Sequence, residues 1–165
     1  MREIKIEKIT LNIGCGDDKE RIEKSKKLLE YLTEKKPVVT TSKKRSTFGV
    51  AKGKPIGVMV TLRGKNALEF LKKSFEAIGK KIKNSQFTDE GNFGIGIREY
   101  IDLPGVKYQH IVGMMGLDVI VTLERAGYRI KRRRIQQRKI SARHRINKED
   151  AIGWVKNNFG VEIIE

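Results

Sequence analysis

The 165-residue sequence has one cysteine, three prolines and two histidines, and only 7% of its residues are aromatic. A disulfide needs two cysteines, so Cys15 cannot form one within the chain and is predicted to be a small packing residue. No apolar run approaches the ~20 residues of a membrane helix, and the first residues carry charges rather than forming the apolar centre of a signal peptide. We therefore expect a cytoplasmic protein.

Motifs of several common site types are also missing. The sequence has no G-x-x-x-x-G-K-[ST], no H-E-x-x-H and no paired cysteines, and His110 and His144 are far apart in it. The glycines at Gly14 and Gly16 resemble a dinucleotide-binding turn, but Lys19 stands where a third glycine is needed. We predict no cofactor, no metal site and no catalytic residue.

Acidic residues are scarce in two long stretches of the chain. The sequence has 36 lysines and arginines against 20 acids, a net charge of +16. Residues 35–65 contain nine basic residues and residues 125–145 contain ten, and neither stretch contains an acid. The remainder of the chain is nearly neutral. Positive charge concentrated in this way is typical of binding to nucleic acid or to an anionic membrane. The low aromatic content favours recognition of the nucleic-acid backbone and shape over base stacking.

Apolar periodicity predicts the secondary structure. Helices are expected over Lys19–Thr33, after a cap at Asn66 with Leu68, Leu71, Phe75 and Ile78 as its apolar side, and over residues 147–158 after a cap at Asn147. Alternating or β-branched runs predict strands at Ile4–Ile13, Val38–Thr41, Ile56–Leu62, Phe93–Ile97, Val119–Leu123 and, at an edge, Val161–Ile164. Residues 80–91 are expected to form a polar connection.

This order of elements predicts an α+β fold in one domain over residues 1–165. A mostly antiparallel sheet would carry its helices on one face, in a ferredoxin-like or split β-α-β arrangement. The other face would be open and would combine polar Asn12 and Thr61 with Gly57, Gly94 and Gly96. We expect a nucleic-acid backbone to approach closely on this face.

Two other functions stay open from the residues alone. Glu99, Asp102 and Asp118 could bind a divalent ion in a metal-dependent RNA-processing enzyme. The basic run from Arg129 to Arg134 could hold the protein on an anionic membrane, although no apolar amphipathic face accompanies it.

Several strings together resemble one family, the universal large-subunit ribosomal protein number five, which binds 5S rRNA. The strings are KIEKITLNIG, KPVVTTSKK, KPIGVMVTLRG, EFL, NFGIGIREY and GLDVIVT, in the order of the family and over nearly the whole chain. The ending RIKRRRIQQRKISARHRINKEDAIGW is similar to the archaeal and eukaryotic branch.

The resemblance implies a non-enzymatic structural protein of the large ribosomal subunit. Such a protein binds 5S rRNA, helps form the central protuberance, contacts the P-site tRNA and contributes to an intersubunit bridge. Its implied partners are 5S rRNA, large-subunit rRNA, a neighbouring 5S-rRNA-binding ribosomal protein and a small-subunit head protein. No membrane is among them. The candidate for the bridge surface is Leu103–Gly116.

The resemblance also distributes site residues. The strand-one asparagine of the family matches Asn12, and its VTLRG string matches Thr61 and Arg63; Thr10 shares the strand face, and Lys35 replaces a bacterial-type glutamine. These five are the expected 5S rRNA contacts. The loop 42–54 is shorter than the bacterial pattern, and its expected tRNA contacts are Lys43, Lys44, Arg45, Lys52 and Lys54. Further rRNA contacts are expected in the basic C-terminal stretch at Arg129, Lys131, Arg132, Arg133 and Arg134.

Overall fold

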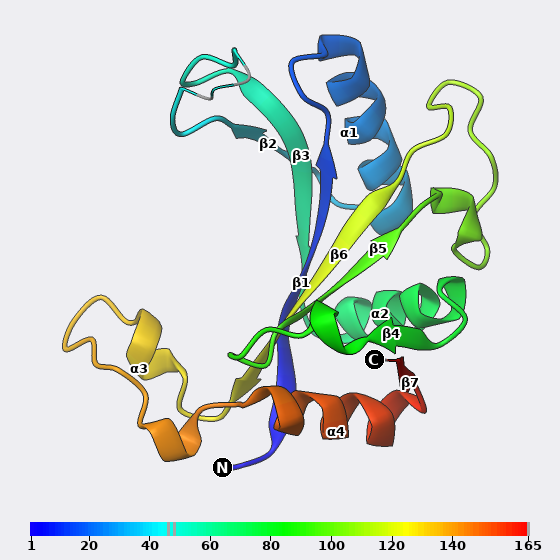
Figure 1. Cartoon of the computed structure of the whole chain (residues 1–165). Coiled ribbons are helices and arrows are strands. Elements are labelled where there is room, and N and C mark those ends of the chain that lie inside the picture. Colours follow the sequence, from blue (N-terminus) through cyan, green and yellow to red (C-terminus); the bar gives the residue numbers. More distant parts are fainter. Residues whose placement is uncertain (46, 48, 165) are drawn as a thin grey trace. The chain divides into compact units, whose positions relative to one another are not determined.

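The computed structural model describes residues 1–45, 47 and 49–164 (Figure 1). The elements in chain order are β1 (Ile4–Gly14), α1 (Lys19–Thr33), β2 (Val38–Thr41), β3 (Pro55–Leu62), α2 (Lys65–Ala77), β4 (Lys81–Lys83), η1 (Asn84–Gln86), β5 (Phe93–Ile97), η2 (Tyr100–Asp102), β6 (Leu117–Arg125), α3 (Arg129–Arg132), η3 (Ala142–His144), α4 (Lys148–Phe159) and β7 (Glu162–Ile164).

The strands form two sheets. A five-stranded antiparallel sheet has the order β2-β3-β1-β6-β5, and β4 and β7 form a separate parallel pair. The predicted α+β class with an antiparallel sheet is therefore confirmed. The predicted short strand near the C-terminus is also confirmed, but its partner β4 lies where we expected only a polar connection.

The chain packs as two compact units. One contains residues 10–62 and 96–119, and we name it the hairpin unit after its β2–β3 hairpin. The other contains residues 1–9, 63–95 and 120–165, and we name it the helical unit. The division runs across β1, β5 and β6, and the prediction of a single domain over residues 1–165 stays a prediction.

In the hairpin unit, α1 has the bounds that the sequence predicted. The carboxylate of Asp18 caps its first turn by accepting hydrogen bonds from the backbone N–H groups of Glu20 (2.9 Å) and Arg21 (3.3 Å). The helix packs on β3 and buries Ile22, Ser25, Leu28, Leu29 and Thr33. Cys15 is buried, with its Sγ 3.1 Å from the hydroxyl of Ser25, so its predicted packing role is confirmed.

In the helical unit, α2 differs from its prediction. The helix begins at Lys65 after Gly64, whose φ of 65° suits a glycine, so Asn66 is not its cap. Its buried side consists of Ala67, Phe70, Leu71, Ser74 and Phe75, whereas Leu68 is 44% exposed. The expected spacing was correct for Leu71 and Phe75 and wrong for Leu68.

An aromatic cluster forms the core of the helical unit. The ring of Phe75 on α2 lies 4.9 Å from that of Phe159 on α4 and 6.3 Å from that of Phe93 on β5. Phe87 and Trp154 extend the cluster.

The predicted cap of α4 is confirmed in position, because Asn147 precedes the helix and its N–H donates to the Asp150 carboxylate at 3.4 Å. The cap is local to the first turn of α4, whereas Phe159 at the other end of the helix joins the aromatic cluster.

Within the described residues, no helix is both long enough and apolar enough to span a membrane.

Candidate nucleic-acid interface

Half-buried polar side chains alternate with buried apolar ones along β1 and β3 of the hairpin unit. Thr10 and Asn12 alternate on β1 with Leu11 and Ile13, and Thr61 alternates on β3 with buried neighbours. Because β1 and β3 pair, Thr10, Asn12 and Thr61 belong to one face of the sheet. We name these three residues the polar row. None of them uses its side chain in a hydrogen bond to another described residue, so the polar row can offer neutral donors and acceptors to a ligand.

The glycines on this face do not share one role. A Cβ on Gly57 would lie 2.7 Å from the carbonyl oxygen of Ile13 and 3.0 Å from Oγ1 of Thr40. Gly57 is therefore required by packing within the sheet, and our expectation that it opens space for an RNA backbone is wrong. Gly96 is exposed, and in the helical unit a Cβ on Gly94 would meet no atom within 4 Å. These two glycines are the positions that leave space.

The other two expected 5S rRNA contacts lie outside the polar row. Lys35 is half-buried in the connection between α1 and β2, directly after Glu34, the left-handed C-cap of the helix. Arg63 is exposed and follows the last residue of β3. The structure thus brings three of the five predicted residues onto one face and places the other two at the ends of neighbouring elements.

The basic loop over residues 42–54 continues the β2–β3 hairpin. At its base the N–H of Ser42 donates to the carbonyl of Lys54, and the N–H of Gly53 donates to the carbonyl of Ser42, both at 2.8 Å. These bonds close the loop where it leaves the sheet. The predicted loop includes residues 46 and 48, which lie outside the described residues.

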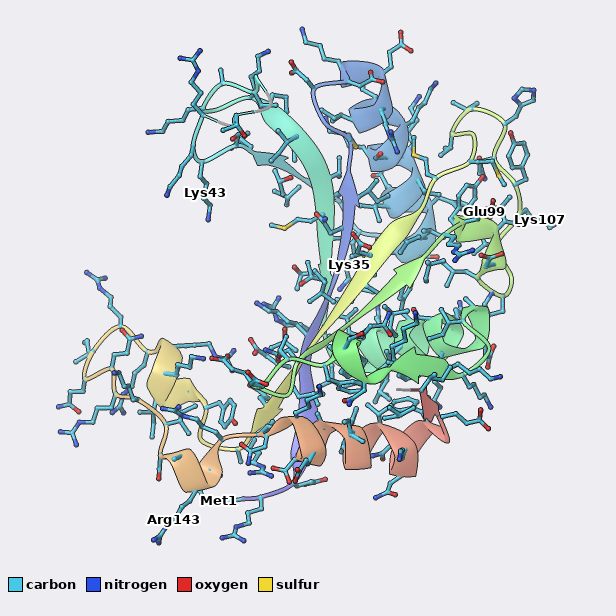
Figure 2. All side chains as sticks on the ribbon, in the orientation of Figure 1. Met1, Lys35, Lys43, Glu99, Lys107 and Arg143 are labelled. Carbon is cyan, nitrogen blue, oxygen red and sulfur yellow. The ribbon has the colours of Figure 1, made fainter. Side chains whose placement is uncertain are left out.

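The cations of this loop are exposed. Lys43, Lys44, Arg45 and Lys52 are all exposed, and Figure 2 shows Lys43 pointing away from the loop. Lys54 differs, because its Nζ lies 2.7 Å from the carboxylate of Asp17 in the turn between β1 and α1. No local pattern indicates this pair, since 37 residues separate its members.

Arg125, at the start of the second basic stretch, is a structural residue. Its side chain is 10% exposed at the end of β6. One terminal nitrogen donates to the carbonyl of Arg145, and the other donates to the carboxylate of Asp150, both at 2.9 Å. The guanidinium thereby fastens the segment before α4 to the sheet, and it is not available to a polyanion.

Some of the five cations predicted in this stretch are also engaged. Arg132 on α3 forms ion pairs with Glu7 of β1 and Glu124 of β6, and Lys131 lies 3.8 Å from Glu90. Arg133 donates from Nε to the carbonyl of Gln136 at 2.8 Å. Arg129 and Arg134 are exposed and have no ion pair within the described part of the chain. The segment is thus partly neutralised by acids that lie outside it in the sequence.

The predicted bridge surface is a connection with both buried and exposed apolar residues. Leu103, Val112 and Met115 are buried and anchor it, and the hydroxyl of Tyr100 accepts a hydrogen bond from the N–H of Gln109 at 2.8 Å. Between these anchors, Tyr108, Ile111 and Met114 are 53%, 68% and 54% exposed. Periodicity could not separate these two sets, because the connection has no regular secondary structure.

The acids of the enzyme hypothesis do not form a metal site. No group of three or more His, Cys, Asp or Glu side chains suited to a metal ion occurs in residues 1–45, 47 and 49–164. Glu99, Asp102 and Asp118 are exposed in the hairpin unit. Exposed acids of this kind are well explained as solvated side chains at strand ends.

Comparison with known families gives two matches that together cover most of the chain. Residues 1–50 match the sequence model described as ribosomal protein L5, and residues 55–154 match the model that describes the C-terminus of the same ribosomal protein family.

Individual relatives agree over the full length. The large ribosomal subunit protein uL5 of Nanoarchaeum equitans is 52% identical over 166 aligned residues, covering 99% of this chain and 98% of the relative. The proteins of the same name from Sulfurisphaera tokodaii and Methanobrevibacter smithii are 48% and 42% identical. The alignments cover 100% and 99% of this chain, and 94% and 97% of the respective relatives.

Proposed function

Because this chain belongs to the ribosomal protein L5 family, we propose that it joins 5S rRNA to the large ribosomal subunit through the polar row of its hairpin unit. Membership itself makes the chain a structural, non-enzymatic protein of the large subunit, with rRNA as its partner and the cytoplasm as its location. The relatives are archaeal proteins, which confirms the predicted branch. The enzyme alternative is thereby set aside.

The observation that carries the 5S rRNA proposal is the polar row itself. Thr10, Asn12 and Thr61 lie on one sheet face, half-buried and without side-chain partners among the described residues. Neutral donors and acceptors in fixed positions suit sugar hydroxyls and base edges, whereas Lys35 and Arg63 suit phosphates. We assign specificity to the polar row and electrostatic attraction to the two cations.

The loop 42–54 is assigned to the P-site tRNA. Its base is fixed by two backbone hydrogen bonds, and Lys43, Lys44, Arg45 and Lys52 are exposed beyond that base. Such a loop holds several cations at the end of a rigid hairpin, where they can reach a second polyanion. Lys54 serves mainly to position the loop through Asp17.

The segment Arg129–Arg134 is assigned to large-subunit rRNA near the central protuberance. Arg129 and Arg134 are its exposed cations, while Lys131, Arg132 and Arg133 interact within the chain. The proposal predicts that Arg134→Ala weakens incorporation into large subunits more than the charge-matched Lys156→Ala on α4. Equal incorporation of the two variants would remove the segment from the interface.

The apolar surface of Tyr108, Ile111 and Met114 is assigned to protein contacts. We propose that it meets the small-subunit head protein of the intersubunit bridge, and that the neighbouring 5S-rRNA-binding protein contacts the chain elsewhere. Exposed apolar side chains on an anchored backbone favour a protein over RNA as their ligand. Ile111→Ser should reduce subunit association in sedimentation, whereas Leu68→Ser, at another exposed apolar position, should not.

The central test measures the affinity of the same protein variants for 5S rRNA and for an unrelated RNA of equal length. Asn12→Ala should weaken 5S rRNA binding by about tenfold, the value of one hydrogen bond of roughly 1.4 kcal/mol, and leave the unrelated RNA unchanged. Asn157→Ala, an exposed asparagine on α4, is the matched control. Lys44→Ala should spare 5S rRNA and reduce tRNA contact on assembled ribosomes. An equal loss for both RNAs with Asn12→Ala would refute the assignment of specificity to the polar row.

A further inference from the structure

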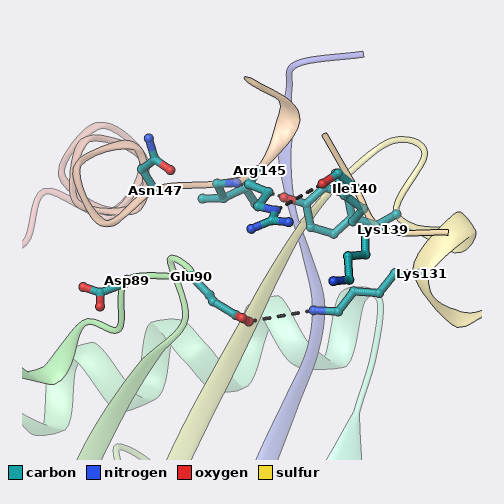
Figure 3. Close-up of a pocket in the computed structure, with 9 residues that line it drawn as sticks. Asp89, Glu90, Lys131, Lys139, Ile140, Arg145 and Asn147 are labelled. Carbon is teal, nitrogen blue, oxygen red and sulfur yellow. Dashed lines mark hydrogen bonds and ion pairs between the residues drawn. The ribbon is translucent and has the colours of Figure 1, made fainter. Parts of the chain in front are cut away.

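A pocket of about 390 Å³ opens in the helical unit beside the basic stretch (Figure 3). Its walls come from the turn at residues 89–90, from Tyr128 and Lys131, and from residues 139–140 and 145–147. This volume falls in the range of small-ligand sites, which is about 300–1,000 Å³. Of its lining residues, only Lys131 belongs to the segment Arg129–Arg134 that is proposed to contact rRNA.

Three cations line this pocket. They are Lys131, Lys139 and Arg145. Arg145 donates from Nε to the carbonyl of Ile140 at 3.1 Å, as Figure 3 shows, which fixes its side chain and leaves both terminal nitrogens for a ligand. A fixed guanidinium with two lysines nearby suits a phosphate group.

The pocket is also lined by two carboxylates, Asp89 and Glu90, and a simple phosphate site would not contain them. Glu90 points toward Lys131 in Figure 3, with 3.8 Å between the carboxylate oxygen and Nζ, and Asn147 lines the pocket nearby. A carboxylate repels a phosphate but accepts hydrogen bonds from N–H groups of a nucleobase. Guanine offers two adjacent N–H donors on one edge, which match the two oxygens of a carboxylate.

The apolar wall is held rigidly in place. The hydroxyl of Tyr128 accepts from the N–H of Ile146 at 2.9 Å and donates to the carbonyl of His144 at 3.3 Å. Ile146 is buried against Gly91, where a Cβ would lie 2.5 Å from its Cγ2. A planar base can therefore stack on a surface that is already formed.

We propose that this pocket binds one unstacked guanine nucleotide of ribosomal RNA. The phosphate lies against Lys139 and Arg145, the base stacks on Tyr128, and Glu90 accepts from the guanine edge after its pair with Lys131 opens. The proposal rests on the RNA-binding function above, because it names the RNA as the source of the nucleotide.

The first experiment titrates the full chain with GMP, with IMP and with inorganic phosphate, and follows backbone amide signals by NMR. IMP lacks only the exocyclic amino group. GMP should shift the signals of Gly91, Tyr128 and Asn147. It should also bind on the order of fivefold more tightly than IMP, because IMP cannot form the hydrogen bond of the amino group. Equal affinity of GMP and IMP, equal shifts with phosphate, or shifts confined to other segments would each overturn the proposal.

Two variants locate the contacts. Glu90→Gln should remove the preference for GMP over IMP while the phosphate shifts remain. Lys139→Ala should weaken both nucleotides, whereas Lys83→Ala, an exposed lysine of β4 in the same unit, should change neither. A GMP preference that survives Glu90→Gln would contradict the role of the carboxylate.

A second experiment tests the source of the nucleotide. A photo-crosslinker on Lys139→Cys in reconstituted large subunits should attach to a guanosine of the RNA, and attachment to protein alone would overturn the RNA assignment. The outcome is separable from that of the proposed function. If Asn12→Ala weakens 5S rRNA binding but GMP does not bind, only the pocket proposal fails.

Discussion

The loop over residues 42–54 and the segment over residues 125–145 both lack acidic residues, yet their cations meet different surroundings. In the loop, Lys54 pairs with Asp17, while Lys43, Lys44 and Arg45 are exposed. In the segment, Arg125, Lys131 and Arg132 all pair with carboxylates from other elements. Positive charge is therefore mostly available in the loop and partly compensated in the segment, although neither contains an acid.

Chain path explains the difference. The loop ends a hairpin that is closed by backbone bonds between Ser42 and residues 53–54, and among its described cations only Lys54 forms an ion pair. The segment instead follows β6 and leads into α4, which brings its cations to Glu7, Glu124 and Asp150. We expect the loop to contribute to RNA affinity and part of the segment to contribute to folding.

The largest expected effect concerns Arg125. Arg125→Met removes a nearly buried guanidinium that bonds to Asp150 and to two backbone carbonyls. The free energy of unfolding should fall by about 3 kcal/mol, at the low end for breaking a buried ion pair because Asp150 is partly exposed. Urea denaturation measures the change. Arg129→Met is the control and should stay within about 0.5 kcal/mol of the parent; equal stability of the two variants would contradict the division of roles.

The next effect concerns the loop and RNA. Changing Lys43, Lys44 and Arg45 together to glutamine should reduce the slope of log affinity for tRNA against log salt by about 2 to 3, because each phosphate contact contributes roughly 0.7 to 0.9. Filter binding at several salt concentrations gives the slope.

The control for the loop variant carries the same change of charge. Lys19, Lys24 and Lys27 are exposed on α1 of the same unit, and changing all three to glutamine should alter the slope by less than about 1. Equal slopes for the two triple variants would mean that net charge alone governs binding and that the loop has no special role.

A smaller effect should appear when Arg132 is released. The double variant Glu7→Gln, Glu124→Gln removes the charge of both carboxylates that pair with Arg132. The affinity for large-subunit rRNA at low salt should rise a few-fold, since about one more cation becomes available to phosphate. Glu76→Gln with Glu149→Gln removes two exposed acids that have no ion pair within the described residues, and it should raise affinity less. Identical gains would show that Arg132 is already available.

The smallest effect is expected at the base of the loop. Asp17→Asn removes the partner of Lys54 in a half-exposed pair, so the free energy of unfolding should change by less than about 1 kcal/mol. Thermal denaturation at low and high salt should show the difference only at low salt. A large loss of stability would mean that the pair supports the hairpin and not only the loop.

Local signals in the sequence predicted the elements that depend on local interactions. Helix α1 was predicted from apolar residues at helical spacing, and β2 was predicted from β-branched residues after Pro37. Both have the predicted bounds. The start of α2 was wrong because Gly64 allows a turn directly before Lys65, and the pattern of large apolar residues overlooked small Ala67.

Long-range pairing explains most of what the sequence could not predict. Strand β4 has three residues, of which only Ile82 is buried, and its partner β7 is about 80 residues away in sequence. Alternation did predict the polar row, because the position of a residue along its strand determines the sheet face on which it lies. Whether Arg125 or Lys54 is available to RNA depends on Asp150 and Asp17, which no local pattern identifies.

The backbone bonds between Ser42 and residues 53–54 also bear on how freely the hairpin can vary in length. These bonds make the register of the β2–β3 pair independent of the length of the loop, because every β2–β3 pair lies on the sheet side of Ser42. Doubling the number of residues in a closed flexible loop costs only about 0.6 kcal/mol. A peptide tag or an evolutionary insertion between Lys43 and Lys52 should therefore leave the sheet in register, and the reach of the hairpin can change while its base stays fixed.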